Sequence, residues 1–496
     1  MFSMLSSAVR LVPFAYPSSV RRLSSSALLG LGCVVLGCSD VSDTTPSSSE
    51  GGSSQADPSA FAVSSMQELD PPSGPGAMAA NWQVLPKVSG NSPADGILPA
   101  LSWLEPFEQD GVRGHRFLTS TLDGETWSPP VEIHSGAGFF ANWADLPGTV
   151  AALDGSRSAH WLQKVADGTY AYGIHRARLD ENGSWQATGW LHEDLSATEH
   201  GFASYVPLEN GDIQAFWLDG REMVGVEHGS SAPSADDHGG HGGGDHEGED
   251  HGGTMQLRTR ILSGGDGDNG DEQVLAPKVC ECCATDAALT SQGPLVVYRA
   301  RSDEEIRDIH VIRHTDQGWT SPSVIHQDGW RIEGCPVNGP AVVADGDFVA
   351  VTWFTAEPQA RVFIAFSDDA GASFSEPLVV DDQWPMGRVD LVLSGPPSAT
   401  IAARSTTVAP RNVMVAWMGT TEDGAEIRWR VMGPDKIGDT QIAVPTNPER
   451  SAGVTRIFKQ QTPNGDRLLF AWIENGEERR LRVGSVSLAE TAGTTP

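Results

Sequence analysis

One pattern recurs seven times along this chain: an apolar strand that ends in Trp or Tyr, then a polar turn and a second strand. The aromatic residues are Trp103, Trp161, Trp217, Tyr298, Trp353, Trp417 and Trp472, separated by 58, 56, 81, 55, 64 and 55 residues. A regular period of this size, made of strands and turns, is typical of a β-propeller built from four-stranded blades. The pattern therefore predicts an all-β ring of seven blades around a central funnel.

The composition fits many short strands and excludes one class of partner. The 496 residues include 55 Gly and 32 Pro, which tight turns require. The formal net charge is −32, whereas a protein that binds nucleic acid needs a basic surface. We therefore expect no nucleic-acid partner, and solubility is the simplest interpretation of the acidity.

The N-terminus has the composition of a secretion signal. Three arginines precede an apolar run over residues 27–36, and no acidic residue lies among them. The run is too short to cross a bilayer, which takes about 20 apolar residues. It ends in Val35-Leu36-Gly37-Cys38, which resembles the bacterial lipobox, where the signal is removed before a cysteine that then carries a lipid. This resemblance predicts a signal peptide over residues 1–37, lipidation of Cys38, and an extracytoplasmic protein anchored at a periplasmic or outer-membrane surface.

Two polar segments lie outside the predicted strands of the ring, which we place over residues 79–496. Residues 38–78 are rich in Ser, Gly, Pro, Asp and Thr and cannot bury enough apolar surface to fold, so we expect a disordered tether. Residues 227–254 lack apolar periodicity and account for the longest gap, so we expect a disordered insertion. The insertion carries His238, His241, His246 and His251 among Gly and acidic residues. It is either a loose site for divalent ions or a tolerated low-complexity loop.

Several third strands lead into a turn of distinctive composition. The clearest copies are residues 367–374 and 120–127, and weaker copies are residues 180–185 and 315–319. In such a turn the Asp can accept hydrogen bonds from amides, the Gly can take a positive φ, and the aromatic residue can hold the turn against its blade. The turns resemble the Asp box of sialidases, a structural motif that faces away from the active site.

From about residue 80 to 490 the chain resembles bacterial sialidase-like (BNR or Asp-box) propeller proteins, often labelled exo-α-sialidase. The phrases that carry the resemblance, beside the turns, are residues 142–145, 159–164, 198–202, 280–283, 335–340 and 387–390. Sialidase propellers have six blades, so six is the alternative to the seven that the aromatic repeat predicts.

The resemblance also implies a chemistry, which this sequence supplies only in part. Sialidases use a late Tyr nucleophile with a Glu partner, an Asp acid/base and three Arg that hold the substrate carboxylate. The last tyrosine here is Tyr298, and the family's Phe-Arg-Ile-Pro motif is missing from the early repeats. We therefore expect a propeller without orthodox sialidase chemistry, with a glycoside hydrolase acting on an acidic sugar as the alternative.

Candidate ligand-binding residues lie at strand ends and in the family-like phrases. They are Arg221, Arg299, Arg307, Arg388, Arg456, Asp145, His200, Asp308 and Asp390. If these strand ends face the funnel, several guanidinium groups can converge on an anionic glycan or small molecule. Alternatively, each arginine pairs with a nearby acid and ties blades together.

Four cysteines fall at the inner-strand starts of two adjacent repeats, which would bring them together in a ring. They are Cys280, Cys282, Cys283 and Cys335. Outside the cytoplasm, two disulfides are the simplest interpretation of an even set. Thiolates also suit copper(I) or zinc, and a redox-active pair is a third option. The sequence thus predicts a lipid-anchored envelope propeller that binds a ligand or carries a metal or thiol site.

Overall fold

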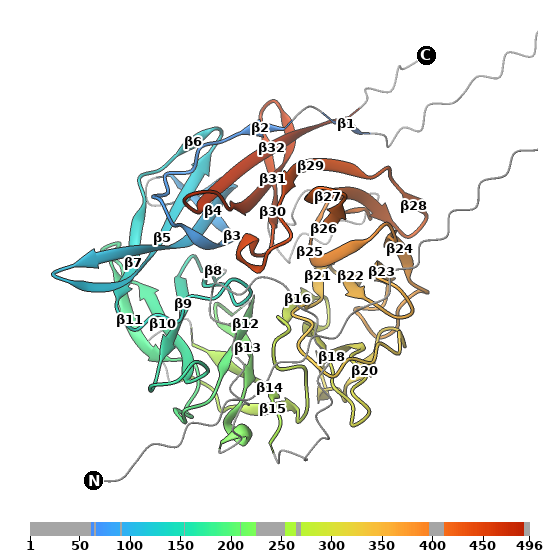
Figure 1. Ribbon diagram of the computed structural model, residues 1–496, viewed down its shortest axis with the longest axis horizontal. Coiled ribbons are helices and arrows are strands. Elements are labelled where there is room, and N and C mark those ends of the chain that lie inside the picture. The colour runs from blue at the N-terminus through green and yellow to red at the C-terminus, as the bar shows by residue number, and fades with distance from the viewer. Residues whose placement is uncertain are drawn as a thin grey trace, which may run out of the picture. The chain divides into compact units, whose positions relative to one another are not determined.

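The computed structural model describes residues 61–63, 66–89, 92–152, 154–208, 210–224, 253–263, 269–395 and 411–490, all within one compact unit, Asp57–Pro496. The predicted signal peptide over residues 1–37, Cys38, and the histidines at 238, 241, 246 and 251 lie outside the described residues. Within this unit seven antiparallel sheets surround a common centre, and the chain visits them in sequence order (Figure 1). The fold is therefore an all-β propeller with seven blades, as the aromatic repeat predicts.

Each blade runs from an inner strand at the centre to an outer edge. Blade I contains β3 (Met78–Ser89), β4 (Ser92–Gln109), β5 (Val112–Asp123), β6 (Thr126–Trp127) and β7 (Val131–Gly136). Blade II contains β8 (Gly148–Ala151), β9 (Arg157–Lys164), β10 (Tyr172–Leu179) and β11 (Trp185–Trp190). Blade III contains β12 (His200–Pro207), β13 (Ile213–Asp219), β14 (Gln256–Leu262) and β15 (Gln273–Ala276).

The other four blades repeat this order. Blade IV contains β16 (Asp286–Thr290), β17 (Gly293–Arg299), β18 (Ile309–Thr315), β19 (Gly318–Trp319) and β20 (Ser323–Val324). Blade V contains β21 (Ala341–Asp345), β22 (Phe348–Thr355), β23 (Arg361–Ser367) and β24 (Leu378–Asp381). Blade VI contains β25 (Pro385–Leu393), β26 (Val413–Thr421), β27 (Gly424–Gly433), β28 (Lys436–Ile437) and β29 (Gln441–Thr446). Blade VII contains β30 (Arg456–Thr462), β31 (Gly465–Glu474) and β32 (Arg480–Glu490), joined by β1 (Phe61–Val63) and β2 (Gln67–Glu68).

The described helical segments are two single turns of 3₁₀-helix, η1 (Arg221–Met223) and η2 (Arg450–Ala452). In the part of the chain that the structure describes, no helix is long and apolar enough to cross a bilayer.

Blade VII contains strands from both ends of the described part of the chain. β1 and β2 pair antiparallel with β32, so that Phe61 faces Glu490 and Gln67 faces Ser485. Leu69 just after β2 is buried in the core between blades VII and I. The prediction of a disordered tether through residue 78 therefore extends too far. Its final part contributes backbone hydrogen bonds to the closing sheet, and the ring begins before residue 79.

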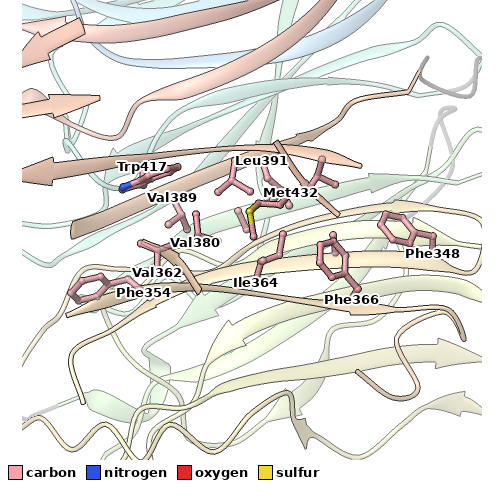
Figure 2. Close-up of a cluster of buried hydrophobic side chains, with 14 of the residues drawn as sticks. Phe348, Phe354, Val362, Ile364, Phe366, Val380, Val389, Leu391, Trp417 and Met432 are labelled. Carbon is pink, nitrogen blue, oxygen red and sulfur yellow. The ribbon is translucent and has the colours of Figure 1, made fainter. Parts of the chain in front are cut away.

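The seven repeated aromatic residues all lie on the second strands and fill the spaces between blades. Each of them is at most 5% exposed. Several indoles also donate a buried hydrogen bond, such as Trp217 Nε1 to Asp219 Oδ2 at 2.8 Å and Trp417 Nε1 to Asp381 Oδ2 at 2.6 Å. Figure 2 shows one such core, where Trp417 packs with side chains from blades V and VI. Each repeated aromatic residue therefore packs between two neighbouring blades, which is why the number of repeats equals the number of blades.

Two of the four turns singled out after the third strands, at residues 367–374 and 180–185, have the hydrogen bonds that their composition predicts. Asp369 Oδ1 accepts from the backbone amide of Ser373 at 2.9 Å, and Gly371 has φ +79°. Asp180 Oδ1 likewise accepts from the amide of Ser184 at 2.9 Å, beside Gly183 with φ +78°. Although partial burial opposes ionisation, the hydrogen bonds from Ser373 lower the pKa of Asp369 to about 2. These carboxylates stabilise the turns.

Candidate metal centre

A cavity of about 220 Å³ lies on the axis of the ring, lined by the inner strands and the loops before them. All seven blades contribute to its wall. Polar residues of the wall are Asn81, Asp145, His160, Tyr205, Asp286, Asn338, Arg388 and Arg456, and the thiol-bearing Cys282 joins them. The axial cavity is thus the place where residues from distant parts of the sequence meet.

Three aspartates at this axis connect neighbouring blades. Asp145 Oδ2 accepts from the amide of Phe202, which joins blades II and III. Asp286 and Asp390 accept in the same way from Val342 and Ile457, so blade IV is joined to V and blade VI to VII. All three bonds are 2.8 Å long. The predicted ligand residues Asp145 and Asp390 therefore have backbone partners that hold the ring together.

The burial of Asp145 makes the stability of the ring depend on pH. Burial raises the pKa of Asp145 from 3.8 to about 7, and the hydrogen bond from Phe202 opposes this only in part. Between these values the folded protein keeps a proton that the unfolded chain has lost, so the stabilisation is complete below pH 3.8 and is lost as the pH rises through about 7. At about 1.4 kcal/mol per pKa unit, the effect is at most about 4 kcal/mol.

We expect Asp145→Asn to flatten this dependence, because asparagine can still accept from Phe202 and does not ionise. Thermal melts at pH 5 and pH 8 measure it: the loss of Tm at pH 8 should be smaller in the variant than in the wild type. Asp316→Asn, at an exposed position, is the control. Equal pH dependence in the wild type and Asp145→Asn would contradict the assignment.

Two of the candidate ligand-binding arginines form hydrogen bonds within the fold. Arg299 is 1% exposed, and its guanidinium donates to the carbonyl oxygens of Asn338, Arg307 and Phe354 at 2.8, 2.6 and 2.7 Å. Arg388 donates to the carbonyl oxygens of Glu449 and Gly453, both at 3.0 Å. Burial lowers the pKa of Arg388 to about 10. All three nitrogens of Arg299 thus donate to backbone carbonyls, and Arg388 bonds backbone from beside the cavity.

Arg221, Arg307 and Arg456 pair with acids, as the alternative interpretation predicts. Arg221 bonds Asp219 and Glu272, each at 2.7 Å. Arg456 lies 3.4 Å from Asp390 and also lines the axial cavity. The five arginines therefore do not converge on one point: only Arg388 and Arg456 line the cavity. Equivalent strand ends share a height along the axis, but the direction of each side chain depends on its local partners.

The other two predicted ligand residues are also enclosed. His200 is fully buried, its ring stacks on His192 with centroids 4.2 Å apart, and its Nε2 lies 3.1 Å from Asp194 Oδ2. Asp308 accepts from the amide of Gly329 at 2.9 Å. Neither His200 nor Asp308 is in the wall of the axial cavity.

The cysteines, in contrast, do come together. Cys280, Cys282 and Cys283 lie in the loop before β16, and their sulfur atoms all lie within 4.8 Å of one another. The Cys280 sulfur is 2.8 Å from that of Cys283 and 4.0 Å from that of Cys282. Among the described residues this is the one group of three potential metal ligands so close together. All four described cysteines have free thiols.

Cys335 lies beside this group, as the adjacency of the two repeats predicts. It is exposed and belongs to the loop before β21. The two loops approach closely, because a Cβ at Gly339 would lie 2.1 Å from the carbonyl oxygen of Ala284. A glycine at this position therefore allows the loop of blade V to pack on the cysteine loop of blade IV.

The cysteine loop is held by a network of charged side chains. Glu281, between two of the cysteines, pairs with Arg301 and with Arg307, the latter at 3.3 Å. Both arginines also pair with Glu305, each at 2.7 Å. Burial alone would raise the pKa of Cys280, but the thiols of its two neighbours and the charge of Arg307 bring that pKa well below its usual value. The site therefore favours one thiolate with two thiols around it.

A tyrosine–glutamate pair next to this site was not predicted from the sequence. The Tyr172 hydroxyl, at the start of β10, donates to Glu199, in the loop before β12. Burial raises the pKa of Tyr172 well above 10 and that of Glu199 to about 8. Tyr172 is 0% exposed, so its oxygen is not accessible as a nucleophile. The sequence signal was only that Glu199 adjoins His200 in a family-like phrase.

No protein-family model and no curated protein matches this sequence. Solved structures resemble it at low identity. A protein of unknown function from Dyadobacter fermentans is 13% identical, over 86% of this chain and 99% of its own, with a TM-score of 0.44. A mutant of the NanB sialidase from Streptococcus pneumoniae is 10% identical over 86% and 94%, with a TM-score of 0.39. An ulvan lyase is 9% identical over 84% and 94%, with a TM-score of 0.46.

Proposed function

We propose that this protein is a lipid-anchored, extracytoplasmic propeller of the sialidase-like kind that binds a thiophilic metal ion through Cys280, Cys282 and Cys283. The observation that carries the proposal is the convergence of three sulfur atoms within 4.8 Å at the axial cavity. Thiolates are soft ligands that select copper(I) and zinc over harder cations. The anchor and the envelope location rest on the lipobox-like sequence before Cys38.

The surroundings of the sulfurs support an ion-binding role. Metal thiolates carry negative charge, and Arg307 lies near enough to Cys280 to favour its charged form. Glu281 and Glu305 hold Arg301 and Arg307 in place, so the loop is organised without a ligand. A site organised in advance loses less entropy when it binds. Cys280 and Cys283, now 2.8 Å apart, would separate by about 1 Å, because sulfurs at about 2.3 Å from one ion lie about 4 Å apart.

The alternative of an acidic-sugar hydrolase finds less support in the site. Arg299 and Arg388 donate to backbone carbonyls, so they do not form a carboxylate clamp. The buried Tyr172 has a raised pKa, whereas a nucleophile needs an accessible oxygen and a lowered one. A metal-binding role uses the residues that do converge.

Metal titration tests the proposal directly. The protein, purified without a His tag and reduced anaerobically, is titrated with Cu(I) against a competing chelator, and separately with Zn(II). We expect about one thiol-bound ion per chain, and a loss of that ion in Cys280→Ser/Cys283→Ser. The matched control replaces His238, His241, His246 and His251 by Asn, which removes the loose loop ligands and should leave the tight site unchanged.

Two results would count against a metal site. One is the absence of a thiol-dependent ion in the wild type. The other is four oxidised cysteines, measured by thiol counting, in protein isolated without reductant and resistant to reduction in the folded state. That result would assign the four sulfurs to two structural disulfides.

A further inference from the structure

The solvent exposure of the four cysteines decreases from Cys335 to the buried Cys280 and Cys283. Cys335 is exposed, Cys282 is partly buried and lines the axial cavity, and Cys280 and Cys283 are each 1% exposed. The loop that carries Cys335 packs on the loop of the other three cysteines, where a Cβ at Gly339 would lie 2.1 Å from the carbonyl oxygen of Ala284, and the Cys282 sulfur is 4.0 Å from that of Cys280. The two packed loops therefore place an accessible thiol beside the partly buried and buried ones.

Cys335 is adjacent to the three-sulfur group without belonging to it. Its sulfur is not among those that all lie within 4.8 Å of one another. A structural zinc site would enclose four ligands in a tetrahedron, whereas three sulfurs with a fourth outside leave one direction open. The Cys280–Cys282 separation of 4.0 Å is the edge expected for three sulfurs about 2.3 Å from one ion in a trigonal plane. This three-plus-one arrangement fits copper(I).

We infer that the site takes Cu(I) and that Cys335 is its entry thiol, which receives the ion from a small-thiol complex and passes it to Cys282 and the buried pair. This inference rests on the proposed function and adds the ion, the route and a role in copper exchange. An ion held only by Cys280 and Cys283 would have to reach sulfurs that are 1% exposed. A thiol at the rim provides an accessible first ligand.

The transfer is a ligand exchange that leaves the oxidation state of copper unchanged. The Cys335 sulfur forms a bond to Cu(I) as one glutathione sulfur leaves, and the departing glutathione thiolate takes up the proton that Cys335 gives up. Cys282 then displaces Cys335 at the ion in the same way, and its proton goes to the Cys335 thiolate. Cys280 then displaces the second glutathione, whose thiolate takes up the Cys280 proton, and Cys283 adds as the third sulfur and gives its proton to the solvent. Copper remains Cu(I) throughout, so no oxidant or reductant is needed.

The experiment measures rate and affinity separately. Reduced wild-type protein is mixed with Cu(I)–glutathione in a stopped-flow instrument, and the copper–thiolate absorbance is followed; affinity is measured by competition with a Cu(I) chelator. We expect Cys335→Ser to slow loading by about tenfold or more and to change the dissociation constant by less than about threefold. Cys283→Ser should instead abolish tight binding.

The control is Glu333→Gln, in the same loop, whose side chain is 73% exposed. It should load copper at the wild-type rate.

Cys335→Ser loading copper as fast as the wild type would overturn the entry role. A dissociation constant weakened more than about thirtyfold in this variant would make Cys335 a ligand of the resting site instead. A wild type that binds Zn(II) but no Cu(I) would overturn this inference and leave the proposed function standing, whereas a wild type that binds neither ion would overturn the proposed function itself. Because Cys335 is exposed, Cys335→Ser should keep the wild-type Tm, which is measured by thermal melts of the same samples.

Discussion

Replacing Arg299 by alanine should lower the free energy of unfolding by about 3–5 kcal/mol. The side chain is 1% exposed and joins blades IV and V by donating to three backbone carbonyls. Its removal leaves these buried oxygens without their charged donor. It also removes a contact in which the guanidinium carbon lies 4.9 Å from the ring centre of Trp330. For a ring of this size we expect Tm to fall by about 5 °C.

Thermal melts of Arg299→Ala and Arg331→Ala test this. Arg331 is nearby in sequence but its side chain is 66% exposed, so its replacement should change the free energy of unfolding by less than about 0.5 kcal/mol. Arg299→Lys should be intermediate, because lysine keeps the charge but cannot donate in three fixed directions. A melt of Arg299→Ala at the wild-type temperature would show that the guanidinium is not a structural tie.

Replacing Trp417 by alanine should cost about 3–5 kcal/mol, by leaving a cavity in the core between blades V and VI. The indole is 0% exposed among the apolar side chains of Figure 2, and its Nε1 donates to Asp381 Oδ2 at 2.6 Å. Trp417→Phe should cost less, about 1–2 kcal/mol, because the ring remains and Asp381 still accepts from Arg428.

Trp384 provides the matched control for this substitution. Its side chain is 78% exposed on the loop before β25, so Trp384→Ala should change the free energy of unfolding by less than about 0.5 kcal/mol. Chemical unfolding followed by circular dichroism measures all three variants. If Trp417→Ala and Trp384→Ala were equally stable, the repeated aromatic would not be a packing residue.

The number of blades was predictable because the signal is local and periodic. The second strand of each blade packs against the neighbouring blade and buries an aromatic side chain there. An aromatic residue therefore recurs once in each blade, at a nearly regular spacing along the chain. The blade-VII contribution of β1 and β2 was missed because these strands are short and lie in polar sequence. They are recognisable only through their partner β32, at the opposite end of the described chain.

The candidate site was predictable in part for a related reason. Cys280 and Cys335 lie in the loops that precede the inner strands of adjacent repeats, and adjacency in the ring follows from the order of repeats. The direction of an arginine side chain does not follow from that order. The sequence therefore left open whether the arginines converge on a ligand or pair with acids, and in the structure Arg388 and Arg456 line the cavity whereas Arg299 does not. The contact of Tyr172 with Glu199 joins two blades through side chains alone and had no periodic signal.

The sequence by itself determined the all-β class, the seven repeats and the neighbourhood of the four cysteines, because period and order fix which strands lie side by side. Only the tertiary structure decided which polar groups face the axis. Burial penalises each charge that lacks a partner, so Arg299 turns to backbone carbonyls, Asp145 to an amide, and the sulfurs to one another. The partner that each buried polar group finds depends on distances between blades, and these distances cannot be read from any one segment of the sequence.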